Sequence, residues 1–213
     1  DVKPGENLVF KLDGNVSSHV YSNSLLTPCL FEYIYFARCD SIIDGINVLD
    51  SRIQIGQLIG NKIKNTLNYN DIDVIVPVPD TSITFANGIQ DILKKPMRYG
   101  LIKNRYIDRT FIMKDGKMIR KNIHRKITGN EYVFKDKTVL IVDDSIVRGN
   151  TGKHIINIVK KFKPKKIIFA SCSPVIRNTN QYGIYIPTKT ELISYNKDVT
   201  EIQQELGVDH LIY

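Results

Sequence analysis

Residues 139–152 read Val139-Leu140-Ile141-Val142-Asp143-Asp144-Ser145-Ile146-Val147-Arg148-Gly149-Asn150-Thr151-Gly152. The first four form a short apolar run, typical of a strand that is buried on both faces of a parallel sheet. Two adjacent carboxylates follow at the carboxyl end of that strand, the edge at which open α/β sheets bind ligands. A loop with two glycines and two hydroxyls then leads into a helical pattern. We expect this strand–loop–helix unit to contain a binding site.

The loop after the carboxylates has the composition of a phosphate cradle. Gly149 and Gly152 permit close approach of the backbone, and N–H groups at a helix N-terminus favour an anion. Because Asp143 and Asp144 would repel a phosphate, they must serve ribose hydroxyls or a Mg²⁺ ion shared with a polyphosphate. The pattern predicts a ligand with a phosphate at one end, a sugar in the middle and a metal-bound group beyond.

Three other interpretations of this stretch fit less well. Residues 149–153 resemble part of an ATP-binding P-loop, but that motif needs four residues between its glycines and Ser or Thr after its Lys. The acidic pair also resembles the start of a phospho-receiver domain, but only 70 residues (144–213) follow Asp143, too few for that fold. A helix cap with a turn would explain one carboxylate, but not two together with the glycines.

Elsewhere in the chain, short apolar strands alternate with helical patterns. The predicted strands are 74–78, 138–142 and 166–170, and the predicted helices are 49–63, 82–94 and 151–162. Residues 8–12 and a turn at 13–15 predict a hairpin, and the aromatic run 30–36 favours another strand. The alternation predicts an α/β fold, with a parallel sheet covered by helices on both faces.

The positive charge of the chain is local. The 213 residues include 30 Lys and Arg against 22 Asp and Glu, a net charge of +8. Residues 103–126 hold nine of the basic residues and two of the acidic ones, so this window alone carries +7. Its field is directed at an anionic ligand near one loop. Polar stretches of this length in compact domains are typically lids or binding loops.

The cysteines and the absence of long apolar runs indicate the cellular compartment. Cys29, Cys39 and Cys172 are odd in number and form no C-x-x-C pair, so a reducing cytoplasm is expected. No apolar run approaches the roughly 18 residues of a membrane span, so we expect no membrane partner. The chain begins with Asp1 and shows no signal segment, and we expect it to be a piece of a longer protein.

With these features placed, the chain resembles the phosphoribosyltransferase domain of the glutamine phosphoribosylpyrophosphate amidotransferase family, the amidophosphoribosyltransferases. The matching strings are 31–38 (FEYIYFAR), 77–82 (PVPDTS), 103–106 (KNRY), 109–112 (RTFI), 142–149 (VDDSIVRG), 182–184 (YGI), 187–188 (PT) and 191–193 (ELI). The resemblance implies a type I phosphoribosyltransferase fold, with a central, mostly parallel sheet, helices on both faces and a flexible lid loop. Residues 1–27 resemble the end of an N-terminal glutaminase domain, and residues 28–213 the phosphoribosyltransferase domain.

The resemblance also implies a role for each matching residue. Asp143 and Asp144 correspond to the carboxylates for ribose and Mg²⁺ in the binding of 5-phosphoribosyl 1-pyrophosphate (PRPP). The 5′-phosphate loop comprises Ser145, Ile146, Val147, Arg148, Gly149, Asn150 and Thr151. The pyrophosphate loop comprises Asp80, Thr81 and Ser82, with the Ser82 hydroxyl near the metal. Lys103, Tyr106 and Arg109 belong to the lid that closes over PRPP and are the expected catalytic residues.

The implied activity is the first step of de novo purine synthesis. Ammonia replaces pyrophosphate on PRPP, with one Mg²⁺ per subunit, and 5-phosphoribosylamine forms. Family members obtain the ammonia from glutamine in a glutaminase domain whose nucleophile is an N-terminal Cys, whereas residue 1 here is Asp. We therefore expect this polypeptide not to use glutamine, which leaves free ammonia as the nitrogen source to test. The family also implies a homo-oligomer and feedback inhibition by purine nucleotides.

The chain departs from the family pattern at several positions. Some members hold an iron–sulfur cluster on four cysteines; Cys29 matches one ligand, but residues 178–182 contain no second one, so no cluster is expected. Cys39, Asp108 and Asn150 stand where Pro, Gly and Thr are usual. Asp108 places a negative charge in the expected lid, whereas Asn150 still offers an amide to a phosphate.

A binding module is the alternative class of function. Some phosphoribosyltransferase-like domains are nucleotide-sensing regulators that bind nucleic acid, and the basic window 103–126 includes Tyr106, Phe111 and His124, which could contact RNA or DNA. A small substrate rich in phosphate explains the same charge with fewer assumptions. The acidic pair distinguishes the enzyme from the binding module, because a pure nucleic-acid binder needs neither Asp143 nor Asp144.

Overall fold

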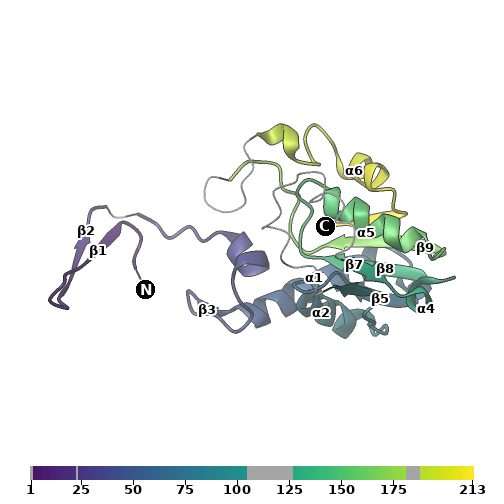
Figure 1. Cartoon of the computed structure of the whole chain (residues 1–213), viewed down its shortest axis with the longest axis horizontal. Coiled ribbons are helices and arrows are strands. Elements are labelled where there is room, and N and C mark those ends of the chain that lie inside the picture. The colour runs from purple at the N-terminus through teal and green to yellow at the C-terminus, as the bar shows by residue number, and fades with distance from the viewer. Residues whose placement is uncertain (1, 23, 105–126, 181–187) are drawn as a thin grey trace.

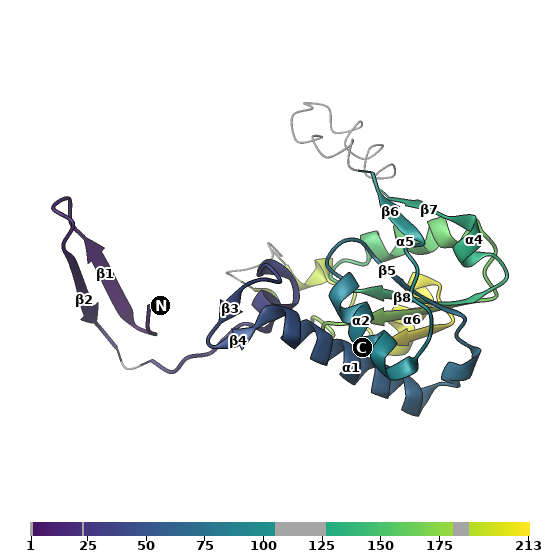
Figure 2. The ribbon, with the colours of Figure 1, turned by 90° about the horizontal axis from the view of Figure 1, so that it is seen from below.

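The computed structural model describes residues 2–22, 24–104, 127–180 and 188–213 (Figures 1 and 2). The strands are β1 (Glu6–Phe10), β2 (Val16–Val20), β3 (Ile42–Ile43), β4 (Ile46–Asn47), β5 (Val74–Pro77), β6 (Leu101–Lys103), β7 (Ile127–Gly129), β8 (Thr138–Asp143), β9 (Lys166–Ser171) and β10 (His210–Ile212). The α-helices are α1 (Val48–Thr66), α2 (Ile83–Leu93), α4 (Glu131–Phe134), α5 (Asn150–Lys160) and α6 (Val199–Leu206). The shorter helices are the π-helix η1 (Glu32–Phe36) and the 3-10 helices η2 (Tyr69–Asp71) and η5 (Lys189–Glu191).

A parallel sheet forms the centre of the molecule. Its strands lie in the order β10-β9-β8-β5, and every neighbouring pair is parallel. At the β5 edge, Ile75 forms a further parallel bridge with Met97. All residues of β5 and β8 are buried, as expected for a parallel sheet covered on both faces. The predicted α/β architecture is confirmed, and the three predicted strands and three predicted helices correspond to β5, β8 and β9 and to α1, α2 and α5.

Alternate residues of the strands build two hydrophobic cores. Val139 and Ile141 of β8 belong to one core, which includes buried side chains of α5 and α6. Leu140 and Val142 belong to the other, which includes buried side chains of α1 and α2. Figure 1 shows α5 and α6 on one side of the sheet and α1 and α2 on the other. Within the described part of the chain, none of the helices combines the length and apolar character that crossing a bilayer requires.

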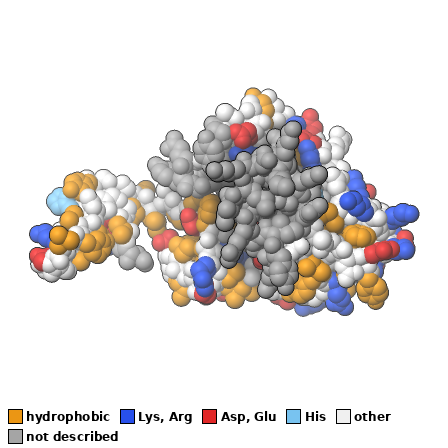
Figure 3. Space-filling view, viewed as in Figure 1, with side chains coloured by type: hydrophobic (Ala, Val, Ile, Leu, Met, Phe, Trp, Pro, Cys, Tyr) orange, Lys and Arg blue, Asp and Glu red, His pale blue; other side chains and the backbone are white. Residues whose placement is uncertain are grey.

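The N-terminal hairpin stands apart from the sheet. Strands β1 and β2 pair antiparallel, which confirms the predicted hairpin. Figure 1 shows it joined to the remaining molecule by an extended segment, and Figure 3 shows hydrophobic side chains on its surface. Phe10 is 73% exposed and Tyr21 is 71% exposed. This hairpin contributes little burial to the domain that contains the sheet.

The aromatic run 30–36 is not the strand that its composition favours. Residues 32–36 form η1, a π-helix in which the Ala37 N–H donates to the Glu32 carbonyl. Ile34 of η1 is fully buried in the core beside α1 and α2. The strand prediction is wrong because tertiary packing, including hydrogen bonds from a buried arginine described below, overrides β propensity in this segment.

Strands β6 and β7 form a short antiparallel hairpin above the sheet (Figure 2). They flank residues 105–126, which include Tyr106 and Arg109 and lie outside the described residues. The first residue of the predicted lid, Lys103, is the last residue of β6. The loop itself therefore stays a prediction.

Candidate active site

The register of the sheet brings two loops together. Pro77, the last residue of β5, pairs with Val142 of β8, and the Val78 N–H donates to the Val142 carbonyl at 2.8 Å. Residues 78–82 and 143–149 therefore leave neighbouring parallel strands at the same edge. In open α/β sheets this edge is where ligands bind.

The acidic pair is held in the sheet. Asp143 ends β8 and is 7% exposed, and its Oδ1 accepts hydrogen bonds from Ser82 Oγ at 3.3 Å and from the Asp144 N–H at 3.0 Å. Burial, followed by the neighbouring charge of Asp144, raises the pKa of Asp143 to about 8. A carboxylate placed here without a cation is destabilised, so the site favours a bound positive charge.

Asp144 is more accessible. Ser145 Oγ donates to Asp144 Oδ1 at 2.8 Å. Burial raises the pKa of Asp144, while the Ser145 hydroxyl and the positive charge of Arg52 act in the opposite direction. The two carboxylates thus share one site in unequal environments.

The loop that follows forms the start of α5. Gly149, at the N-cap of α5, has φ of +77°, a conformation that favours glycine. The first N–H groups of this helix have no partners within the helix, and its dipole favours an anion here. A phosphate cradle requires such a helix N-terminus, and the binding of phosphate here stays a prediction.

A C-terminal segment braces that loop. The Ile193 N–H donates to the Val147 carbonyl at 2.9 Å, and Arg148 Nε lies 2.8 Å from Glu191 Oε2. A Cβ atom added to Gly149 would lie 2.4 Å from Ile193 Cδ1. The loop before α5 is therefore fixed by contacts from residues 191–193.

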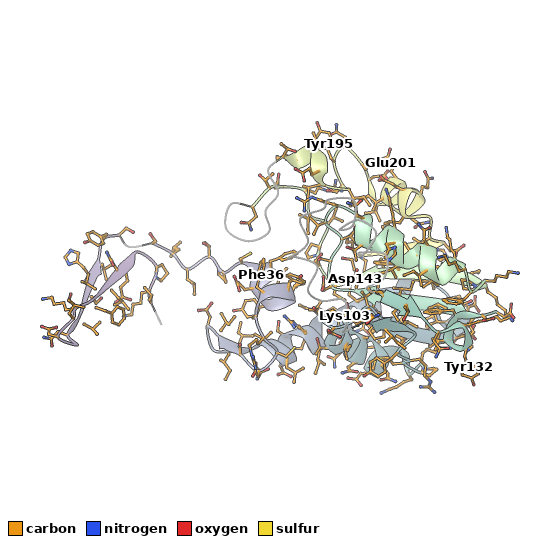
Figure 4. The ribbon with its side chains drawn as sticks, in the orientation of Figure 1. Phe36, Lys103, Tyr132, Asp143, Tyr195 and Glu201 are labelled. Atoms are coloured by element: carbon orange, nitrogen blue, oxygen red, sulfur yellow. The ribbon has the colours of Figure 1, made fainter. Side chains whose placement is uncertain are left out.

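One cavity of about 530 Å³ joins these parts. The predicted site residues that line it are Asp80, Thr81, Lys103, Asp143, Asp144, Ser145, Ile146, Val147, Arg148, Gly149, Asn150 and Thr151. Ser82 is almost fully buried and reaches the site through its hydrogen bond to Asp143. Figure 4 labels Asp143 and Lys103 near the carboxyl ends of the strands. The structure thus brings together every predicted site residue except Tyr106 and Arg109, which lie outside the described residues.

Lys103 contacts the loop after β5. Its Nζ lies 3.5 Å from Asp80 Oδ2, and both side chains are partly open to solvent. The pair connects the base of the predicted lid to the predicted pyrophosphate loop. It also reduces the negative charge at a place where an anionic ligand would bind.

The cavity has an aromatic side that the sequence did not assign to the site. Phe31 and Tyr35 line it, together with Val78, Pro79, Ile127 and Gly152. The sequence signal was present, because Phe31 and Tyr35 lie in the string FEYIYFAR that carries the resemblance. Composition alone gave that string only a strand prediction.

The donor set fits Mg²⁺ that is shared with a ligand. Across the described ranges, no cluster of three His, Cys, Asp or Glu side chains could hold a metal by itself. Asp143, Asp144 and the Ser82 hydroxyl offer hard oxygen atoms on one side only. Mg²⁺ commonly binds one or two carboxylates together with substrate phosphates and water, which is what this donor set allows.

The fold and the family comparison place the chain in the phosphoribosyltransferase class of domains. The chain belongs to the phosphoribosyl transferase domain family, whose model matches residues 47–190. Along its whole length it is similar to amidophosphoribosyltransferases, with 47% identity over 215 residues to that of Pasteurella multocida and 46% over 214 residues to that of Escherichia coli. These alignments cover 100% of this chain but 43% and 42% of the relatives. The chain therefore spans less than half the length of the curated relatives it matches.

Solved structures agree with this assignment. The glutamine PRPP amidotransferase from B. subtilis, complexed with ADP and GMP, matches with a TM-score of 0.82 and 37% identity. The match covers 99% of this chain and 45% of that one. The resemblance stated from sequence and the expected type I phosphoribosyltransferase fold are confirmed.

Proposed function

We propose that this chain carries out the phosphoribosyl transfer of an amidophosphoribosyltransferase, converting PRPP and ammonia to 5-phosphoribosylamine and pyrophosphate in purine biosynthesis. The observation that carries the proposal is one cavity that joins a glycine loop at a helix N-terminus, an acidic pair and a second loop with a lysine. The names of the relatives at 46–47% identity support the choice of ammonia as the acceptor.

Each part of the site suits one part of PRPP. The N–H groups of residues 145–151 would bind the 5′-phosphate, since α5 begins there. Asp143 and Asp144 would accept hydrogen bonds from the ribose hydroxyls. Asp80, Thr81 and Ser82, with Lys103, would surround the pyrophosphate. The proposal thus keeps the phosphate, sugar and metal-bound group that the sequence predicted.

Mg²⁺ is the cofactor we propose, held by Asp143, Asp144 and Ser82 together with oxygens of the ligand. When bound, it would neutralise charge on the leaving pyrophosphate. Asp143 becomes easier to ionise beside a cation, because opposite charge favours its carboxylate. No iron–sulfur cluster is proposed.

The residues of the chain orient a substitution at ribose C1. A bond forms between the ammonia nitrogen and C1, and the bond from C1 to the pyrophosphate oxygen breaks, with its electron pair leaving on that oxygen. The nitrogen then loses one proton to solvent, which gives the neutral amine. The acidic pair lies where it can stabilise positive charge that develops on the sugar, and Lys103 where it can stabilise negative charge on pyrophosphate. Tyr106 and Arg109 are proposed lid residues that exclude water during this step.

The partners of the longer protein are also proposals. Residues 1–27 are proposed to belong to a glutaminase unit and residues 28–213 to the transferase domain; the exposed apolar hairpin supports the first assignment. The ADP and GMP in the B. subtilis structure support purine nucleotides as inhibitors. A homo-oligomer is proposed from the family alone. A reducing cytoplasm is supported by Cys29, Cys39 and Cys172, which are free thiols.

The test is an assay of pyrophosphate and phosphoribosylamine formation with PRPP, Mg²⁺ and either ammonium chloride or glutamine. We expect turnover with ammonium chloride, none with glutamine, and loss of turnover in Asp144→Asn. A chain that neither binds PRPP nor turns it over, but binds RNA with a steep salt dependence that Asp144→Asn leaves unchanged, would support the nucleic-acid module.

A further inference from the structure

Arg52, in the first turns of α1, is a buried cation. Its side chain donates from all three nitrogens to one short segment of chain. Nε donates to the Tyr33 carbonyl at 2.6 Å, one terminal nitrogen to the Ala37 carbonyl at 2.9 Å, and the other to Cys39 Sγ at 3.1 Å. The residue is 2% exposed, and its guanidinium carbon lies 5.8 Å from the centre of the Phe85 ring. Such a fork fixes the segment 33–39 at three points.

A charge in this position calls for an explanation. In the described part of the chain, Arg52 forms no ion pair with a carboxylate, although burying a charge is costly without compensation. Its compensation comes from backbone carbonyls of η1 and its C-cap, which have no partners within so short a helix. A cation also interacts favourably with the carbonyl end of a helix. The guanidinium thus takes the place of a C-terminal cap for η1.

The segment that Arg52 holds is the aromatic side of the cavity. Phe31, the N-cap of η1, and Tyr35, within it, both line the cavity beside the acidic pair. Their ring centres lie 6.4 Å apart, and Tyr35 is 5.5 Å from the ring centre of Phe36. Figure 4 labels Phe36 at the end of η1 and Asp143 at the end of β8. The rotation of η1 therefore decides how the rings border the site.

We propose that Arg52 is a positioning residue for the transfer reaction: it fixes η1 so that Phe31 and Tyr35 keep water away from ribose C1. The inference rests on the proposed function, because it assigns the aromatic side of that same site. Arg52 does not touch the reacting atoms and acts through the segment that it holds. Burial raises the pKa of Asp144, and the positive charge of Arg52 also acts against that rise, an effect that Arg52→Lys retains while losing the three-point fork.

The competing reaction is hydrolysis. When the aromatic side is loosened, a water oxygen bonds to C1 in place of the ammonia nitrogen, and the bond to pyrophosphate breaks as before. The water loses a proton to solvent, and the products are ribose 5-phosphate and pyrophosphate. The number of pyrophosphates released per phosphoribosylamine formed measures the exclusion of water, and general unfolding of the chain does not change this ratio.

The first experiment compares this ratio in the wild-type chain, Arg52→Lys and Arg52→Met with ammonium chloride as nitrogen source. Lys keeps the charge but cannot reach all three acceptors, and Met removes both the charge and the hydrogen bonds. We therefore expect both variants to raise the ratio of pyrophosphate to phosphoribosylamine about tenfold, because small misplacements of groups around a reacting centre have large effects on rate. Arg38→Met is the matched control, because the Arg38 side chain is 82% exposed and pairs with the exposed Asp40 in the same segment. An unchanged ratio in both Arg52 variants would overturn the inference.

A second experiment follows the segment without activity. In a Cys29→Ser background, Cys39 is modified with a thiol reagent; we expect it to react about tenfold faster in Arg52→Lys than in the parent, on the scale of losing one to two hydrogen bonds. Phe31→Ala should raise the hydrolysis ratio and leave the Cys39 rate unchanged, since it keeps the Arg52 contacts. Equal Cys39 rates with and without Arg52 would contradict the inference.

The two failures can be told apart. If the wild-type chain does not bind PRPP, both the proposed function and the inference about Arg52 are wrong. If the wild-type chain forms phosphoribosylamine and the Arg52 variants have the same ratio of pyrophosphate to phosphoribosylamine, only the inference about Arg52 is wrong.

Discussion

The Ser82 hydroxyl donates to Asp143 Oδ1 at 3.3 Å, and this contact links the loop after β5 to the carboxylate at the end of β8. The two residues are 61 positions apart in sequence and both are buried. In the proposed function, Ser82 belongs to the pyrophosphate side of the ligand and Asp143 to the sugar side. The contact therefore lies where the metal would bridge the two.

Ser82→Ala tests that bridge. Removing the hydroxyl takes away a hydrogen bond worth about 1 kcal/mol, so we expect the Kd for PRPP with Mg²⁺ to rise about fivefold. Isothermal calorimetry with and without Mg²⁺ measures the effect, and Thr66→Ala, which removes an exposed hydroxyl of α1, is the control. Weakening that is equal with and without Mg²⁺ would show that Ser82 does not act through the metal.

Asp143→Asn should stabilise the chain in the absence of divalent cations. The folded-state pKa is raised, so the unfolded chain loses this proton at lower pH than the folded chain, and wild-type stability falls as pH rises from 3.8 to about 8. The Asn variant has no such proton to lose, so its gain in free energy of unfolding over the wild type should grow across this window and reach at least about 1 kcal/mol at pH 8. Thermal unfolding at several pH values measures it, with the exposed Asp91→Asn as control. A gain that shrinks toward pH 8 would contradict the expected direction.

Gly149→Ala should damage the proposed phosphate loop beyond the cost of its backbone conformation. Gly149 and Gly45 both have φ of +77°, but an added Cβ meets Ile193 only at Gly149 and has open space at Gly45. Each substitution pays about 1–3 kcal/mol for the left-handed conformation, and only Gly149→Ala must also displace a buried side chain. We expect Gly149→Ala to have the lower Tm and to lose binding of ribose 5-phosphate. Equal Tm and equal binding in the two variants would count against a preformed loop.

Lys103→Met should affect binding more than stability. The pair with Asp80 is 39% and 66% exposed, so its loss should change the free energy of unfolding by less than about 1 kcal/mol. The Kd for PRPP should rise about tenfold, because a charged contact to phosphate oxygen is lost. Lys135→Met is the control, since Lys135 forms a comparable surface pair with Glu131 on α4, away from the cavity. Similar binding in both variants would remove Lys103 from the site.

Much of the fold could be predicted because its strands are continuous apolar runs. Residues 138–142 have no alternation, and only a strand buried on both faces accounts for that pattern. Strand β10 was missed because it has three residues, and helix α6 because its apolar positions are few. The signal for α6 was present, since Asp198 and Glu201 form a capping box and Gly207 ends the helix in the left-handed region.

Part of the site could likewise be predicted from the sequence, and part could not. Asp143, Asp144 and the glycine loop are contiguous in sequence, so their chemistry could be predicted together. Arg52 and Glu191 act across the fold, and no local sequence pattern indicates that Arg52 contacts η1 or that Glu191 contacts the loop before α5. The strand prediction for residues 30–36 was wrong because the hydrogen bonds from Arg52 and the burial of Ile34 decide that segment.

Calorimetric titration of the chain with PRPP and Mg²⁺, repeated with Asp144→Asn, tests most directly that the acidic pair and the glycine loop hold PRPP. The account predicts one PRPP per chain for the wild type and a Kd at least about tenfold higher for Asp144→Asn, because a half-buried, charged acceptor for the sugar and metal is lost. Wild-type binding that the substitution leaves unchanged, or no binding by a folded wild-type chain, would contradict it.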